Sequence, residues 1–260
     1  MIVIRNVGKT FQVKDGDPVV ALQDIDLDVG DKEFVTIVGP SGCGKSTLLK
    51  LVVGLLPLTA GEIFIGEEKV AGPYRDVGMV FQQPVLMPWR TVIENILYPV
   101  EILRLNDKDY RKVAHDLIEL TGLKGFERHK PRQLSGGMQQ RVSICRALIY
   151  DPLLLLMDEP FGALDAMTRE EMGFELLRIW RERKKTILFV THSIPEAVLL
   201  ADRVIVFTPR PGRIAKVIPV RLPRPRDAEM EFSPEFREHV REIKDLIFSG
   251  RALSATPHRA

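Results

Sequence analysis

The chain has 260 residues, of which 45% are hydrophobic and 28% charged, and its net charge is +2. This length allows one large domain or two small ones, and the near-neutral charge gives no support for a nucleic-acid-binding surface. The apolar runs are far shorter than the roughly eighteen residues of a membrane-spanning helix, and polar residues follow the start too soon for a signal peptide.

The N-terminal part alternates apolar and polar residues up to Gly30-Asp31, which predicts antiparallel strands that end in a turn. Phe34–Val38 is a continuous apolar run and predicts a buried strand. It leads into the glycine-rich run Gly39-Pro-Ser-Gly-Cys-Gly-Lys45-Ser46, and we expect a helix from Ser46 onward.

Helical spacing begins near residue 81 and continues to about residue 149. The stretch Asp109–Leu120 places its apolar residues on one helical face. Met138, Val142, Cys145 and Ile149 recur at intervals of four, three and four, which predicts an amphipathic helix.

Beyond this region the sequence predicts short buried strands at Leu153–Met157, Ile187–Val190 and Val204–Phe207, with a connecting helix over Thr168–Arg183. Strands that are apolar throughout belong to parallel sheets covered on both faces. The pattern is therefore that of an α/β fold.

The C-terminal part changes character after Thr208. Residues 213–222 predict an outer strand, and Pro223 begins an extended linker. Ser233-Pro234 predicts a helix start, with serine as the cap and proline at the first position. The apolar stripe of that helix predicts packing against the core, the alternative being a partner-binding helix; residues 249–260 are expected to form a loose tail.

The glycine-rich run after the first buried strand has the spacing of a phosphate-binding loop. Its glycines allow backbone N–H groups to turn toward phosphate oxygens at the start of a helix. Lys45 supplies a charge for the β- and γ-phosphates, and Ser46 a hydroxyl for Mg²⁺. A nucleoside triphosphate is the predicted ligand.

A second site is predicted where Leu154-Leu-Leu-Met-Asp158-Glu159 ends a strand in two carboxylates. Asp158 is the candidate for holding Mg²⁺ through water. Glu159 is the candidate general base for the attacking water. The alternative is a solvated strand end, which the phosphate-binding loop makes the weaker interpretation.

The run Leu134-Ser-Gly-Gly-Met-Gln-Gln-Arg141, together with the phosphate-binding loop and the acidic strand end, resembles the signature of ATP-binding-cassette (ABC) ATPases. The resemblance covers nearly the whole chain. It implies an α/β P-loop NTPase of ABC type, with a mainly parallel core sheet, flanking helices, a small antiparallel β subdomain and a helical subdomain. We expect the ATPase domain at 1–222, its helical subdomain at about 84–150, and a C-terminal linker, helix and tail at 223–260.

The same resemblance implies roles for individual residues. Glu159, His192 and Gln82 would be catalytic, and Ser46, Gln82 and Asp158 would serve the metal. Nucleotide contacts would come from Phe11, Gly39, Pro40, Ser41, Gly42, Cys43, Gly44, Lys45, Ser46, Thr47, Ser135, Gly136, Gly137, Gln139 and Asp165. Phe11, expected to stack on adenine, has an alternative role as an apolar cap of the β subdomain. Because the signature acts on ATP bound to another subunit, the chain would need to dimerise.

Two further features concern reactivity and partners. The two cysteines, Cys43 and Cys145, lack metal-ligand spacing, which favours a reducing, cytosolic setting. Cys43 stands at a helix N-terminus, which predicts a lowered thiol pKa and inhibition by thiol reagents; we expect Cys43 to serve as a small side chain that fits the loop, the alternative being a redox switch. Residues 84–105 predict the base of the helical subdomain together with a groove for a permease helix, with Met87 and Trp89 as groove candidates.

The motifs Met157–Arg169, Leu86–Ile96 and Pro209–Ile214 resemble the ATPase subunits of bacterial nitrate, sulfonate and taurine importers. The resemblance implies an ATPase that uses ATP and Mg²⁺ on the cytoplasmic face of the inner membrane. Its partners would be a second ATPase subunit, transmembrane permease subunits and a periplasmic or lipid-anchored binding protein, without nucleic acid. The alternatives are a non-transport ABC ATPase of DNA repair or translation, or a small-molecule kinase.

Overall fold

The computed structural model describes residues 1–14 and 16–254 and divides into two compact units. One unit contains residues 1–75 and the chain from Thr186 onward, and the other contains residues 76–185. The chain thus leaves the first unit, builds the second and returns. Both ends of the sequence therefore contribute to the first unit.

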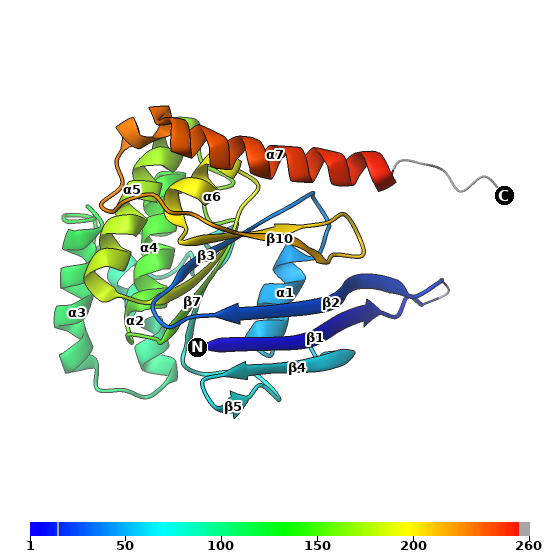
Figure 1. Cartoon of the computed structure of the whole chain (residues 1–260). Helices are drawn as coiled ribbons and strands as arrows, with labels where there is room; N and C mark the ends of the chain where they lie inside the picture. The colour runs from blue at the N-terminus through cyan, green and yellow to red at the C-terminus, as the bar shows by residue number, and fades with distance from the viewer. Residues whose placement is uncertain (15, 255–260) are drawn as a thin grey trace. The chain divides into compact units, whose positions relative to one another are not determined.

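The first unit contains a four-stranded antiparallel sheet with the order β2-β1-β4-β5. Its strands are β1 (Ile2–Phe11), β2 (Val19–Val29), β4 (Ala60–Ile65) and β5 (Glu68–Lys69). Alternate residues of β1 and β2 are buried, so one face of each strand contributes to the core. Figure 1 shows this sheet as the blue and cyan arrows.

The second sheet of this unit holds β3 (Phe34–Val38) between two parallel neighbours. These are β8 (Thr186–Val190) and β9 (Arg203–Phe207), and β10 (Ile214–Pro219) pairs antiparallel with β9. All five residues of β3 and of β8 are buried, as a parallel strand covered on both faces requires. The helices α1 (Lys45–Val52) and α6 (Ile194–Leu200) each follow one of these two strands along the chain.

The C-terminal part of the first unit is fixed to α6 by two arginines. Arg224 donates to the Leu200 carbonyl and to Asp202, whose carboxylate also accepts the N–H of Phe34. Arg226 is buried and donates to the carbonyls at the end of α6. The segment after Pro223 is therefore anchored along its length.

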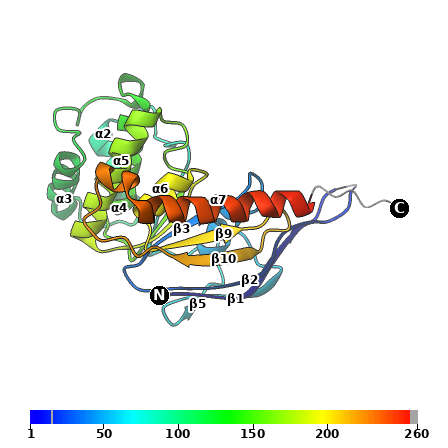
Figure 2. The same ribbon diagram turned by 45° about the horizontal axis from the view of Figure 1, so that its top comes forward.

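The last helix, α7 (Pro234–Ser254), begins at the predicted serine cap, because the N–H of Phe236 bonds to Ser233 Oγ at 3.2 Å. It contacts α6 and β9, and Figure 2 shows it alongside them. Phe236 and Ile243 are buried, so the prediction that its apolar stripe packs on the core is confirmed. The predicted loose tail is wrong for 249–254, because the helix continues to Ser254; the rest of that tail lies outside the described residues.

The second unit pairs β6 (Val77–Val80) in parallel with β7 (Leu154–Asp158) and surrounds them with helices. The helices α2, α3, α4 and α5 pack successively on one another, and α4 also contacts β6. Their bounds are Val92–Ile102, Asp107–Leu120, Gly136–Leu148 and Ala166–Arg183, with a short 3-10 helix, η1, at Pro131–Gln133. The helices and strands expected in this region are confirmed.

Candidate nucleotide-binding and catalytic residues

The glycine-rich run joins the end of β3 to α1, as the sequence predicts. Gly44 stands at the helix N-cap with φ +104°, and a Cβ there would lie 2.6 Å from a methyl group of Leu22. Both the backbone angle and the space require glycine. The loop therefore approaches β2 closely at the position where α1 begins.

The ammonium of Lys45 lies inside this loop and is buried. Its Nζ donates to the carbonyls of Gly39 and Pro40, each at 3.0 Å, and lies 3.9 Å from Cys43 Sγ. These carbonyls replace water around a charge that would otherwise be costly to bury. Ser46 and Thr47 follow in the first turn of α1, and both are half-buried.

Cys43 corrects one prediction from the sequence. The thiol is only 1% exposed, and its burial raises the pKa, while the nearby Lys45 opposes the shift. The helix N-terminus and the lysine together do not outweigh desolvation of the thiolate. The predicted lowered pKa is therefore wrong, and Cys43 has the character of a small buried side chain.

Phe11 ends β1, opposite Val19 of β2. Ala21 and Leu22, a little further along β2, lie against Gly44 of the glycine loop. The Phe11 ring is 37% exposed, and Lys9 Nζ lies 5.1 Å from the ring centroid. Lys9 is itself held by a 2.7 Å bond to the Pro57 carbonyl. The Phe11 ring is thus partly exposed, and its stacking on adenine stays a prediction.

His192 lies two residues after the end of β8 and is exposed. The register of β3 and β8 pairs Ile37 with Val190, and the N–H of Thr191 bonds to the Ile37 carbonyl at 3.1 Å. Parallel strands end at the same edge of a sheet, where α/β proteins bind ligands. His192 and the beginning of the phosphate-binding loop thus share one edge of the first unit.

The remaining predicted site residues belong to the second unit. Asp158 ends β7 and Glu159 follows it, both half-buried. Glu159 has φ +46°, a left-handed conformation that is unfavourable for a residue with a Cβ and that concentrates at functional sites. The N–H of Gly162 bonds to the Glu159 carbonyl at 3.0 Å and closes a turn after it.

Asp165 caps α5 beyond that turn. Its carboxylate accepts the Thr168 N–H at 3.0 Å and the Thr168 hydroxyl at 2.7 Å, and the backbone bond is the main cause of its lowered pKa. Asp165 is exposed, so the charge is available to a second molecule while the cap holds its position.

The signature run forms the N-terminus of α4. Ser135 is the cap, with the Met138 N–H donating to its Oγ at 3.2 Å, and Ser135 and Gly136 are exposed. A Cβ on Gly137 would lie 2.6 Å from a methyl group of Thr168, so the close approach of α5 leaves room only for glycine at this position. Gln139 Nε2 is held by the carbonyls of Pro131 and Leu134, which braces the loop before the helix.

Gln82 lies just after β6 and is exposed. The backbone on either side of it is held by two residues of α4 that the sequence did not indicate. Gln140 donates to the Phe81 carbonyl at 3.3 Å. Arg146 donates to the carbonyls of Pro84 and Val85, each at 2.8 Å, and burial lowers its pKa. The helical spacing of α4 was visible in the sequence, but nothing in the sequence indicates that its polar face holds this loop.

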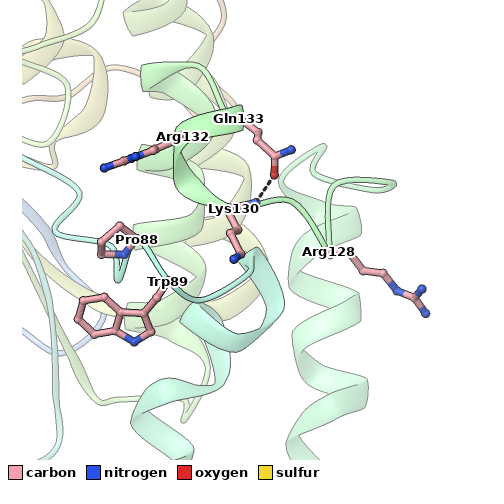
Figure 3. Close-up of a pocket in the computed structure, with 6 residues that line it drawn as sticks. All are labelled: Pro88, Trp89, Arg128, Lys130, Arg132 and Gln133. Atoms are coloured by element: carbon pink, nitrogen blue, oxygen red, sulfur yellow. Dashed lines mark hydrogen bonds between the residues drawn. The ribbon is translucent and has the colours of Figure 1, made fainter.

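The loop after Gln82 borders an open hollow of about 620 Å³ in the second unit. Its lining combines Trp89, which is 69% exposed, with Pro88 and the basic segment before the signature. Figure 3 shows Lys130 and Arg132 on the same side as Pro88 and Trp89, with Arg128 directed away. The Gln133 side chain accepts the Lys130 N–H at 2.8 Å and closes the η1 turn. Lys130 and Arg132 make the side of the hollow near Trp89 basic.

The described residues contain neither a membrane-spanning helix nor a cluster of metal-binding side chains. None of their helices is both long and apolar enough to cross a membrane. Their His, Cys, Asp and Glu side chains form no group of three or more that could hold a metal ion.

The fold and the glycine loop between β3 and α1 define a P-loop NTPase. A family model described as ABC transporter matches residues 22–162, and the chain belongs to this family. The ATP-binding cassettes of this family are ATPases, and this chain is one of them.

Curated relatives match almost the whole chain. An uncharacterised ABC transporter ATP-binding protein of Methanocaldococcus jannaschii is 48% identical over 94% of this chain and 90% of its own length. An aliphatic sulfonates import ATP-binding protein of Bacillus cereus is 45% identical, covering 91% of this chain and 93% of the relative. A taurine import ATP-binding protein of Roseobacter denitrificans is 43% identical, covering 94% and 93%.

Solved structures support the same fold. A dimeric ATP-binding cassette in a post-hydrolysis state, bound to ADP and phosphate, matches with a TM-score of 0.75 and 36% identity, over 85% of this chain and all of that one. CbiO1 from Clostridium perfringens matches with a TM-score of 0.75 and 24% identity over 97% of this chain and 98% of that one. The predicted α/β fold of ABC type is confirmed.

Proposed function

We propose that this ATPase powers import, and that two copies close around two ATP molecules. The observation that carries the proposal is that one chain contains two helix N-termini preceded by glycine-containing runs, Gly39–Thr47 at α1 and Ser135–Gly137 at α4, and helix N-termini favour phosphate. In a dimer, the first would hold the phosphates of one ATP and the second would contact the γ-phosphate of the ATP held by the other copy. The similarity to a dimeric cassette with ADP and phosphate supports this arrangement.

Each predicted residue has a role in this proposal. Phe11 stacks on adenine, and Lys45 contacts the β- and γ-phosphates. Glu159 polarises the attacking water, His192 contacts the γ-phosphate and that water, and Gln82 connects water and metal to the membrane partner. The other proposed nucleotide contacts are Gly39, Pro40, Ser41, Gly42, Cys43, Gly44, Ser46, Thr47, Ser135, Gly136, Gly137, Gln139 and Asp165.

The proposed metal is Mg²⁺, with Ser46, Gln82 and Asp158 as its protein contacts. Hydroxyl, amide and carboxylate oxygens are the hard donors that Mg²⁺ prefers. Mg²⁺ also keeps several waters and takes substrate phosphates, so it needs no cluster of three acidic residues among the described part of the chain. When bound, the ion would neutralise charge on the β- and γ-phosphates.

The proposed partners are transmembrane permease subunits and a periplasmic or lipid-anchored binding protein, with the ATPase on the cytoplasmic face of the inner membrane. The hollow bordered by Trp89 supports a docking surface, because exposed aromatic residues are enriched where proteins associate. Lys130 and Arg132 favour an acidic segment there. Similarity to sulfonate and taurine import proteins supports nitrate, sulfonate, taurine or a similar small solute as cargo.

The test is affinity purification of Glu159→Gln protein from native membranes in mild detergent with ATP, followed by mass spectrometry. We expect a multi-span permease, and we expect Trp89→Ala or Lys130→Glu to reduce its recovery at least severalfold. Leu55→Ala is the matched control, because Leu55 is a 51% exposed apolar residue of the first unit. Recovery of only soluble or nucleic-acid-bound partners would contradict transport and favour a non-transport ABC ATPase.

A further inference from the structure

The turn between β9 and β10 lies against the phosphate-binding loop. Gly212 in this turn exchanges backbone bonds with β2: its N–H donates to Ala21, and its carbonyl accepts from Gln23, both at 3.0 Å. A Cβ on Gly212 would lie only 2.0 Å from the Cys43 carbonyl oxygen, so only glycine fits this approach. The turn is therefore fixed to both β2 and the phosphate-binding loop.

Arg210 extends from this turn to the loop. Its Nη2 and Nε donate to the Gly42 carbonyl at 2.9 and 3.2 Å, so one carbonyl accepts two bonds from a charged group. Charge-assisted bonds are stronger than neutral ones. From the β9–β10 turn, Arg210 thus holds the Gly42 carbonyl in its direction.

The direction of the Gly42 carbonyl also sets the direction of an N–H group. A trans peptide is planar, with its C=O and N–H pointing opposite ways, so a carbonyl fixed at Arg210 turns the Cys43 N–H away from it. That N–H makes only a long 3.4 Å bond to the Pro40 carbonyl. Gly42 has φ +74° and no side chain, so on its side of the peptide group no side chain resists a rotation.

We propose that Arg210 is a positioning residue for ATP binding, which holds the Gly42–Cys43 peptide group with its N–H available to a phosphate oxygen. Without the guanidinium the peptide can rotate and present its carbonyl to the phosphates, which repels them. The proposal rests on the proposed role of residues 39–47 as the phosphate site. It assigns a function to the Pro-Arg-Pro-Gly motif at 209–212.

The test compares the affinity of Arg210→Ala, Arg210→Lys and wild type for ATP and ADP with Mg²⁺. Losing a charge-assisted bond at an exposed site should raise the Kd and the KM for ATP about five- to tenfold, with kcat at saturating ATP nearly unchanged. Arg210→Lys retains a donor and should recover part of the affinity. Amide hydrogen exchange at Cys43 should accelerate in Arg210→Ala while the thermal transition stays in place.

Arg213→Ala is the matched control, because it removes the same charge from the same turn. Arg213 pairs with Asp24 at 3.0 Å, and its side chain has no bond to the loop. If Arg213→Ala weakens ATP binding equally, or if the Arg210→Ala effect disappears in high salt, general charge attraction explains the result and the proposal is overturned. Lys45→Ala tests the phosphate site itself, because unchanged ATP binding by this variant would refute the site. If Lys45→Ala loses ATP binding while Arg210→Ala binds ATP like the wild type, only the role of Arg210 is refuted.

Discussion

Asn95 holds Met87 by both of its backbone groups: the Met87 N–H donates to Oδ1 at 2.8 Å, and Nδ2 donates back to the Met87 carbonyl at 3.2 Å. The same Nδ2 reaches the carbonyls of Arg90 and Thr91. Asn95 is 1% exposed on α2, so a single buried amide fixes the loop that carries the proposed docking residues.

Asn95→Leu should therefore lower the free energy of unfolding by about 2–4 kcal/mol, because several buried polar groups lose their partner. Urea denaturation measures this loss. Asn95→Asp keeps the acceptor for Met87 but sets a carboxylate oxygen against the three carbonyls, so it should lose at least as much. Asn106→Ala, which removes the exposed cap of α3, should lower it by only about 1 kcal/mol. Equal losses for Asn95→Leu and Asn106→Ala would show that the buried network contributes nothing beyond a helix cap.

Glu159→Gln should keep ATP binding and lower kcat by about a hundredfold or more, because the amide keeps the shape of the side chain without its basicity. Phosphate release and nucleotide fluorescence measure the two effects separately. Glu170→Gln, on the exposed side of α5, is the control and should hydrolyse ATP normally. Near-normal turnover in Glu159→Gln would remove this residue from the role of general base.

Ser135→Ala should destabilise the protein by about 1 kcal/mol through loss of the α4 cap, and it should also weaken ATP-dependent dimerisation. Thr91→Ala removes the capping box of α2 and provides the comparison. In a Glu159→Gln background, size-exclusion chromatography with ATP should show dimers for Thr91→Ala and fewer for Ser135→Ala. Equal dimerisation of the two variants would show that Ser135 acts only as a helix cap.

Cys145 predicts a pH dependence of stability, since complete burial raises its thiol pKa from 9.0 to about 12. A raised pKa means that the folded state keeps a proton which the unfolded state loses. The stabilisation of the folded state by the buried, protonated Cys145 thiol is thus complete below pH 9 and disappears as the pH rises toward 12. Between pH 8 and 10.5 the wild type should lose about 2 kcal/mol more than Cys145→Ala in urea denaturation. Parallel pH profiles for the two proteins would contradict the raised pKa.

The elements that follow strong local patterns could be predicted from sequence. Phe34–Val38 predicts a buried strand because four of its five residues are apolar and β-branched or aromatic, and Ser233-Pro234 predicts the start of α7 because a cap and a proline act locally. The short α6 and the strand β4 were missed. They carry little periodicity of their own, and they are placed by contacts with distant residues, such as the pairing of β4 with β1.

The candidate site divides in the same way. Lys45, Glu159 and Ser135 stand in motifs whose spacing indicates chemistry, so the sequence alone names them. Arg210 and Gly42 are far apart in the chain, and only the packing of the β9–β10 turn brings them together. The pKa of Cys43 depends on how deeply the loop buries its thiol, which no motif records. Local rules therefore predicted the functional groups, whereas long-range contacts determine how those groups are held.

The anchoring of Arg224 and Arg226 has a practical consequence for work with this protein. A chain cut after Leu222 would leave the carbonyls at the end of α6 without their guanidinium donors and would uncover the face that α7 covers. An affinity tag or a fluorescent fusion at residue 223 would produce the same loss. Such additions should therefore be attached beyond α7, and a shortened version made by removing the C-terminal segment would be a poor substitute for the whole subunit.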